Sequence, residues 1–191
     1  TTKPRREWEI RTPEAADVSR LSRDRGLPEI ISRMLVARGI TDAKQADKHL
    51  QPNLMALHDP ALLPGMQAAT RRLVEAVRQG ETILIHGDYD VDGVTGTSLL
   101  VRLFEKLGAK VDWHIPNRFT DGYAFGDHSV AKAQSIGAKV VVSVDNGTSS
   151  LETITKLLDL GIETIVTDHH EPPLGDLPPA TAIVNPKLHD A

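Results

Sequence analysis

The stretch "ETILIHGDYDVDGVTGTSLLVRLFEKLG", residues 81–108, contains the pattern that decides the fold. It begins with a short apolar run, 81–85, of the β-branched type found in buried strands. It ends with a run that is typical of a helix and closes at Gly108, a residue type favoured where helices stop. Three aspartates and a glycine lie between the two. A strand, an acidic turn and a helix together form one unit of an α/β sheet.

The same alternation continues on both sides of this stretch. An amphipathic helix over 66–80 precedes it, and helix–strand pairs follow it as far as residue 167. The expected later strands are "KVDWHI", "KVVVSV" and "ETIVT", with "TAIV" as one more after a Pro-rich loop. Alternating strands and Gly-capped helices predict an α/β fold with a mostly parallel sheet flanked by helices.

The first 64 residues have a different character. The segment "PEIISRMLVARG" (28–39) has apolar residues at helical spacing, and a connector at 51–66 contains four Pro or Gly residues. We therefore expect a small helical and irregular cap over 1–64, followed by an α/β domain over 65–191.

The composition excludes several classes of protein. Hydrophobic residues make up 40% of the chain and charged residues 25%, with no apolar run near the ~20 residues that a membrane span needs. The chain has no Cys, which fits a reducing compartment, so we expect a cytoplasmic protein with no membrane partner. Aromatic residues are only 4%, which argues against broad base-stacking platforms.

The charge is unevenly distributed along a chain of net charge −4. Residues 1–40 hold nine Lys and Arg against six Asp and Glu, leaving 13 against 20 for the rest. An acidic region that handles phosphates needs metal ions to reverse the local sign. A plain solvated surface explains the same excess, so composition leaves both interpretations open.

Asp88, Asp90 and Asp92 alternate along "HGDYDVDG" (86–93), where like charges repel unless a cation lies among them. An EF-hand calcium loop reads D-x-D-x-D-G but ends in a bidentate Glu at its twelfth position. That position here is Leu99, and a strand rather than a helix precedes the loop. The EF-hand interpretation is therefore excluded.

Acidic and imidazole side chains also follow other expected strands. Asp145 follows the third strand, and Asp168, His169 and His170 follow the fourth. Because the carboxyl ends of parallel strands share one edge, these side chains should meet where ligands bind. The alternative is that each Asp only caps the next helix, which stays open for Asp145 but explains three acids in five residues poorly.

Asp and His without Cys favour Mn²⁺ or Mg²⁺ over soft metals, and a bridging carboxylate suggests two ions ~4 Å apart. Such a pair suits phosphoester hydrolysis. The P-loop motif is missing, which argues against that kind of nucleotide binding. "DVDGV" (90–94) also resembles the first motif of haloacid-dehalogenase-type phosphatases, but the later "TDHH" (167–170) replaces the acidic pair expected there.

The ordered set "HGDYDVDG", "VSVDNG" (142–147) and "TDHH" resembles the first three motifs of the DHH phosphoesterase superfamily. Three further stretches resemble its RecJ branch of single-strand-specific 5′→3′ DNA exonucleases; they are 38–66, "IPNRFTDGY" (115–123) and "AIVNP" (182–186). The resemblance implies a two-metal-dependent exonuclease that acts on single-stranded DNA in recombination and repair. The implied partners are the DNA, a single-strand-binding protein and a helicase.

The resemblance also implies roles for individual residues. The expected metal ligands are His86, Asp90, Asp92, Asp145 and His169. The expected catalytic residues are His170 at the scissile phosphate, Asp88 as an acid that orients a ligand, and Arg118 at a DNA phosphate. A buried structural role for His86 and a plain surface role for Arg118 remain alternatives. Asp168 is expected to hydrogen-bond backbone or imidazole rather than metal.

The superfamily's fourth motif, which supplies another Asp, has no match after "AIVNP". We therefore expect an N-terminal fragment of a larger exonuclease, inactive alone, that binds one Mn²⁺ weakly. One alternative is a DHH phosphodiesterase for short oligonucleotides or cyclic dinucleotides, against which the RecJ-like first 66 residues argue. Another is a relative that binds metal or nucleotide without catalysis, against which the intact motifs argue.

Overall fold

A computed structural model describes residues 12–188 except 118, 120 and 122–124. The chain divides into two compact units, 1–58 and 59–191. The first unit contains α1 (Ala15–Arg25), α2 (Glu29–Val36), α3 (Ala43–Leu50) and the short helix η1 (Leu54–Ala56). Its small core consists of Val18, Leu21, Leu35, Val36 and Ala46.

The second unit is a five-stranded parallel sheet with helices between the strands, as the sequence predicted. After η2 (Pro60–Leu62), its helices are α4 (Met66–Gln79), α5 (Val91–Lys106), α6 (Asp127–Ser135) and α7 (Leu151–Asp159). Its strands are β1 (Thr82–Gly87), β2 (Lys110–His114), β3 (Val140–Val144), β4 (Glu163–Thr167) and β5 (Ala182–Val184). They lie in the order β2-β1-β3-β4-β5, and every neighbouring pair is parallel.

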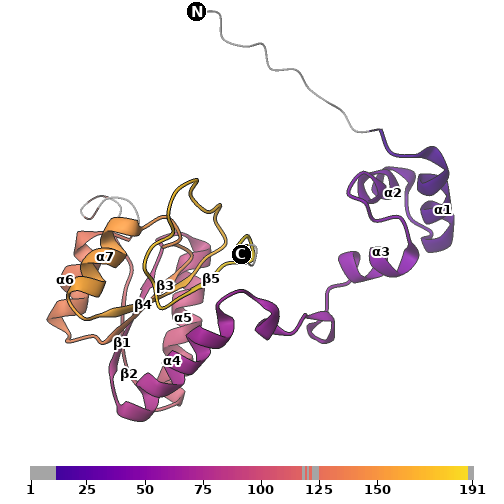
Figure 1. Ribbon diagram of the computed structural model, residues 1–191. Helices are drawn as coiled ribbons and strands as arrows, with labels where there is room; N and C mark the ends of the chain where they lie inside the picture. The colour runs from indigo at the N-terminus through magenta and orange to yellow at the C-terminus, as the bar shows by residue number, and fades with distance from the viewer. Residues whose placement is uncertain (1–11, 118, 120, 122–124, 189–191) are drawn as a thin grey trace, which may run out of the picture. The chain divides into compact units, whose positions relative to one another are not determined.

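The sheet is buried on both faces because its strands are nearly continuous apolar runs. Ile83, Ile85 and Val142 pack with residues of α4 and α5, whereas Leu84 and Val141 pack with residues of α6 and α7. Figure 1 shows the two pairs of helices on opposite sides of the sheet. In this three-layer arrangement, alternate residues of one strand face different helices.

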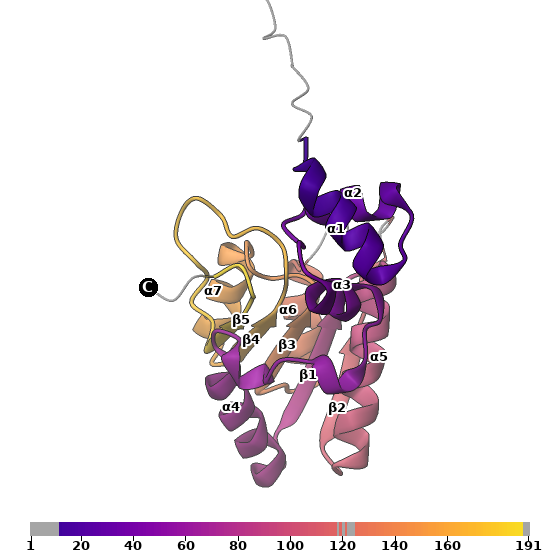
Figure 2. The same cartoon turned by 90° about the vertical axis from the view of Figure 1, so that its right-hand side faces the viewer.

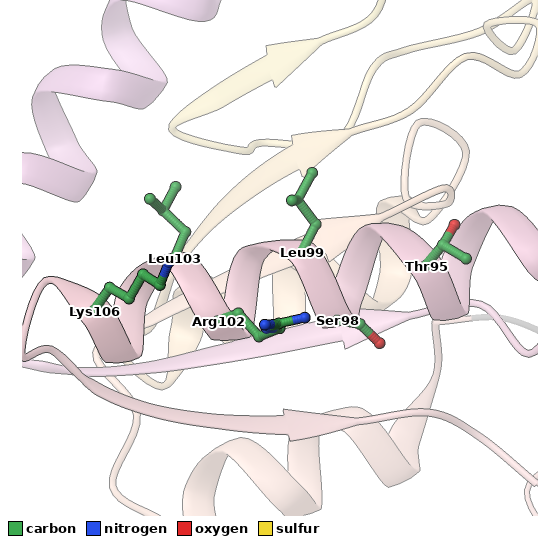
Figure 3. A pocket seen from close by; sticks show the side chains of 6 residues that line it. All are labelled: Thr95, Ser98, Leu99, Arg102, Leu103 and Lys106. Carbon is green, nitrogen blue, oxygen red and sulfur yellow. The ribbon is translucent and has the colours of Figure 1, made fainter.

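The outer face of α5 is partly apolar. Leu99 is 70% exposed and Leu103 48% exposed, and both point to the same side of the helix in Figure 3. Thr95, Ser98, Arg102 and Lys106 line the same shallow surface. In the described part of the chain, no helix combines the length and the apolar character needed to cross a bilayer.

The strand order places a switch point between β1 and β3. From β1 the chain moves outward to β2, then returns past β1 to β3 and continues to β4 and β5 (Figure 2). Loops at the carboxyl ends of β1 and β3 therefore leave the sheet toward opposite faces, which opens a crevice between them. The first two acidic motifs of the sequence lie in those two loops, and the third follows β4.

Candidate metal centre

Three aspartates are the first residues beyond three neighbouring strands. Each backbone N–H still donates a hydrogen bond to the adjacent strand, so the sheet ladder continues through the motif residues. The donor–acceptor pairs are Asp88 with Val144, Asp145 with Thr167 and Asp168 with Val184, at 3.2, 2.9 and 3.0 Å. The sheet itself therefore fixes the backbone positions of these three aspartates at its carboxyl edge, as the sequence predicted from their position after the strands.

Asp90 caps helix α5. Its Oδ1 accepts hydrogen bonds from the backbone N–H groups of Asp92 and Gly93, at 3.0 and 3.1 Å. A Cβ on Gly93 would lie 2.3–2.6 Å from the backbone of Asp88, so only glycine allows the turn to close this tightly. The capping interpretation is thus correct for Asp90, and the same cap holds its carboxylate beside the sheet edge.

Asp145 has a different local role. Ser150 rather than Asp145 is the N-cap residue of α7, so the capping interpretation is wrong for this acid. Asp145 has a positive φ of 64°, and among the described residues no other non-glycine has one. Such backbone conformations are concentrated at functional sites, where the surrounding structure must hold them in place.

The carboxylates of Asp88, Asp90 and Asp145 form one group, in which one oxygen of each lies within 4.8 Å of the others. Hydrogen bonds from the backbone of Gly93 hold the pKa of Asp90 below its ordinary value. Burial and then the neighbouring Asp90 raise the pKa of Asp145. The part of the Asp145 shift that comes from the charge of Asp90 is a repulsion that a bound cation would relieve.

Asp145 also belongs to a second group, with His169 and His170, whose ligand atoms again lie within 4.8 Å of one another. The Oδ1 of Asp145 lies 2.9 Å from Nε2 of His169. This contact is an ion pair without hydrogen-bond geometry, and the buried Oδ1 accepts no hydrogen bond from the described residues. One carboxylate is therefore shared by an all-carboxylate group and a group that contains imidazoles.

Asp168 is buried and organises the third motif by hydrogen bonds, as the sequence predicted. Its Oδ2 accepts from the N–H of Thr148 at 3.0 Å, and its Oδ1 accepts from the backbone of His169 and from Nδ1 of His170, both at 2.7 Å. Burial works to raise the pKa of Asp168, but the bonds from Thr148 and His170 outweigh it and lower the pKa. The same contact with Asp168 raises the pKa of His170.

Asn185 is a positioning residue that the sequence analysis missed. It lies just beyond β5, is fully buried, and donates to the carbonyl of His170 at 2.9 Å and to Oγ1 of Thr148 at 3.0 Å. The signal that could have found it is its place in "AIVNP", one more polar residue after one more strand. Asn185 thus ties the third motif to the edge of the sheet.

Two predicted ligands lie elsewhere. His86 is fully buried in β1, and its metal-competent group among the described residues consists of His114 and His128 rather than the aspartates. Asp92 is exposed in the first turn of α5 and belongs to neither of the two groups that share Asp145. Arg118 lies outside the described residues, and its role stays a prediction.

The donors at this edge fit a hard or borderline divalent cation. Carboxylate oxygens and neutral imidazoles suit Mn²⁺, and carboxylate oxygens suit Mg²⁺. The buried Oδ1 of Asp145, which lacks a hydrogen bond, is the atom that would gain most from such an ion. We call Asp88, Asp90, Asp145, His169 and His170 the carboxylate site.

Comparisons with known proteins show the family to which the chain is similar. A family model described as "DHH family, N-terminal domain" matches residues 82–191. The single-stranded-DNA-specific exonuclease RecJ of Bacillus subtilis is 36% identical over 180 residues, which are 94% of this chain and 23% of that protein. The chain thus spans about a quarter of this curated relative's length.

Solved structures show the same likeness. The Thermus thermophilus RecJ structure in complex with Mn²⁺ matches with a TM-score of 0.68 and 30% identity, over 93% of this chain and 24% of that one. A structure of RecJ from the same organism in complex with Mg²⁺ matches with a TM-score of 0.52 and 27% identity, over 90% and 22% of the two chains.

Proposed function

The chain belongs to the DHH family, and from that premise we propose that it supplies the metal-binding part of an exonuclease that hydrolyses single-stranded DNA from the 5′ end. The relative named above acts specifically on single-stranded DNA, which supports the substrate class. The proposed cofactor is Mn²⁺ or Mg²⁺, the two ions held by the Thermus structures. The proposed biological setting is DNA recombination and repair.

The observation that carries this proposal is that Asp145 belongs to two groups of possible metal ligands. Its carboxylate lies within ligand distance of Asp88 and Asp90 on one side and of His169 and His170 on the other. A carboxylate between two ligand sets is the arrangement that a pair of ions about 4 Å apart requires. We therefore propose Asp145 as the bridging ligand, with Asp90 and His169 as ligands on either side of it.

Two ions bound there would polarise a phosphoryl oxygen and lower the pKa of a bound water. The chain's own residues then have separate tasks. Asp168 holds the ring of His170 through Nδ1, which leaves Nε2 available to contact a non-bridging oxygen of the scissile phosphate. The raised pKa of His170 favours its protonated form, which suits an anionic phosphate.

The remaining predicted residues receive lesser roles. Asp88 is proposed to orient or supplement the ligands of Asp90, and Asp92 to reach the site only when substrate and metal are bound. Arg118 is proposed to contact a DNA phosphate. His86 has other neighbours and is left out of this ligand set.

The proposal assigns partners and a location as well. Because the matched segment is about a quarter of the relative's length, we propose that turnover needs the equivalent of the relative's remaining residues. Single-strand-binding protein and a helicase are proposed to deliver the substrate. An enzyme that digests chromosomal DNA works where that DNA lies, so we place it in the cytoplasm.

The test is an assay on single strands labelled at the 5′ or the 3′ end, with Mn²⁺. Residues 1–191 are assayed alone and in place of the matching segment of the Bacillus relative. We expect negligible digestion by residues 1–191 and release of the 5′ label first by the chimera. Release of the 3′ label first would refute the polarity, and preferential cleavage of two- to five-nucleotide substrates would favour the short-oligonucleotide phosphodiesterase.

A further inference from the structure

We propose that His86, His114 and His128 form a second metal site, a three-imidazole cluster for a borderline divalent cation of the zinc type. This imidazole cluster lies at the same end of the sheet as the carboxylate site but shares no residue with it. Its occupant would be held by nitrogen alone, which is a different chemistry from that proposed for Asp90 and Asp145. The proposal does not depend on exonuclease activity.

The three histidines come from three different elements. His86 and His114 are register partners at the carboxyl ends of the adjacent parallel strands β1 and β2. His128 lies in the first turn of α6, the helix that packs over this face of the sheet. One ring nitrogen of each lies within 4.8 Å of those of the other two. The fold thus converges three imidazoles that are far apart in the sequence.

The ring spacing agrees with that of a tetrahedral site. The ring centroids are separated by 5.5 Å between His86 and His114, 5.8 Å between His86 and His128, and 5.2 Å between His114 and His128. Zinc–nitrogen bonds of about 2.0–2.1 Å at tetrahedral angles place the centroids of two imidazole ligands about 5 Å apart. A cation between the rings requires only a small adjustment of each side chain.

The hydrogen bonds of the cluster leave the ligand atoms free. The Nε2 atoms of all three rings are buried, and none has a hydrogen-bond partner in the described part of the chain. Three buried polar atoms without partners in one small space are unusual, because buried polar groups are nearly always paired or bound to an ion. Nε2 of a neutral imidazole is one of the two ring nitrogens that bind metal ions.

His86 carries the supporting features of a metal ligand. Its Nδ1 lies 3.3 Å from Oγ of Ser129, a contact that orients the ring and leaves Nε2 for a ligand. The ring also packs on Phe125 at a centroid distance of 4.7 Å, which gives the site an apolar wall.

The competing interpretation is a purely structural aromatic cluster of neutral histidines and Phe125. That interpretation explains the ring packing but leaves the three Nε2 atoms unsatisfied. A cation satisfies all three at once and joins β1, β2 and α6 at one point. Since β1 leads directly into the loop of Asp88 and Asp90, such a clamp would also stiffen the carboxylate site.

The test uses the 191-residue chain with Co²⁺ and Zn²⁺ as probes. Mn²⁺ is added first in excess to fill the carboxylate site. Co²⁺ should then give the intense visible absorption of a four-coordinate site with three imidazole ligands and a water, and Zn²⁺ should displace it. X-ray absorption of the zinc-loaded chain should count three imidazoles. A count of one or none, or binding at the carboxylate site only, would overturn the proposal.

Variants separate the two sites. His114→Gln and His128→Gln should each weaken Co²⁺ binding about 100-fold or more, since loss of groups outside the ligand shell already costs 10–100-fold. His49→Gln, on the exposed surface of α3, and Asp145→Asn should leave the spectrum unchanged. Zinc should raise the melting temperature of the wild type and not that of His128→Gln. Equal binding by all four variants would contradict the cluster, and the absorption measurement on the wild type decides the matter if a variant does not fold.

Discussion

The carboxylate site and the imidazole cluster lie at the carboxyl ends of the same parallel strands, yet they differ in burial and in donor type. The first is built around Asp145, and the side chains of His169 and His170 are each about 60% exposed. The second is built around His86, which is fully buried against Phe125 and α6. One sheet edge thus carries a more exposed, oxygen-rich site and a more buried cluster of three imidazoles.

The difference follows from where each side chain leaves the sheet. Asp88 and Asp145 come after the last residues of their strands, at the ligand edge of the sheet, where Asp145 is buried and Asp88 is half-buried. His86 is still within β1, and its side chain enters the packed layer under α6. Two residues along β1 therefore separate the fully buried His86 from the half-buried Asp88 at the ligand edge.

The largest expected effect comes from Asp145→Asn. Asn keeps the size of the side chain and tolerates the positive φ, but it removes the charge shared by both ligand sets. We expect Mn²⁺ affinity to fall by about 1,000-fold, or about 4 kcal/mol, while Co²⁺ binding at the imidazole cluster is unchanged. Calorimetric titration measures both, with the exposed Asp159→Asn as control. Loss of both metals together would show that the two sites are not separate.

A change of pH should affect the imidazole cluster through stability. His86 has a pKa of about 3 in the folded chain because it is buried, whereas an unfolded histidine titrates near ~6.5. Between these values the unfolded chain binds more protons, so stability should fall as the pH drops, by on the order of 3 kcal/mol between pH 7 and pH 4. Chemical denaturation of metal-free protein from pH 7 to 4 measures it. A profile for His86→Gln as steep as that of the wild type would contradict this assignment.

Gly93→Ala should damage only the carboxylate site. The added Cβ would meet the backbone of Asp88 at 2.3–2.6 Å, so the acidic turn must open. We expect a loss of about 2 kcal/mol of stability and weaker Mn²⁺ binding, with the Co²⁺ spectrum retained. Gly175→Ala, which has open space around it, is the matched control. If the Gly93→Ala chain is destabilised but its Mn²⁺ affinity is unchanged, the shape of the acidic turn does not determine metal binding and the prediction is wrong.

The smallest expected effect is that of Lys156→Met. Lys156 pairs with Asp127 and Glu152, each at 2.8 Å, on the partly exposed surface of α6 and α7. Such pairs contribute about 0.5 kcal/mol or less. Asp127 precedes His128 in α6, so this variant tests whether zinc binding by the imidazole cluster depends on the surface ion pair. Thermal melts with and without zinc should be nearly those of the wild type, and a large loss of zinc affinity would show that α6 needs the pair.

The sequence predicted most of the fold because its local patterns agree with one another. Gly108 ends a helix, "TILIH" forms a buried strand, and the position of Asp145 after a strand places it at the ligand edge. The shared position of Asp145 could be expected from topology. Its distances to Asp90 and His169 could not, because they depend on the twist of the sheet and on side-chain rotamers.

The imidazole cluster could not be predicted from spacing. His86 and His114 meet because β1 and β2 pair in one particular register, and His128 joins them because α6 packs over that face. Neither register nor helix packing is encoded in a short motif. Asn185 was overlooked for a related reason, because its bonds to Thr148 and His170 depend on β5 pairing with β4.

The central claim is that Asp145 lies between two ligand sets and receives the catalytic metal. The most direct measurement is anomalous diffraction from crystals of the chain soaked in Mn²⁺ and, separately, in Zn²⁺. We expect Mn²⁺ density bonded to a carboxylate oxygen of Asp145, with Asp90 or His169 as a further ligand. Manganese density remote from Asp145 in well-ordered crystals would contradict it.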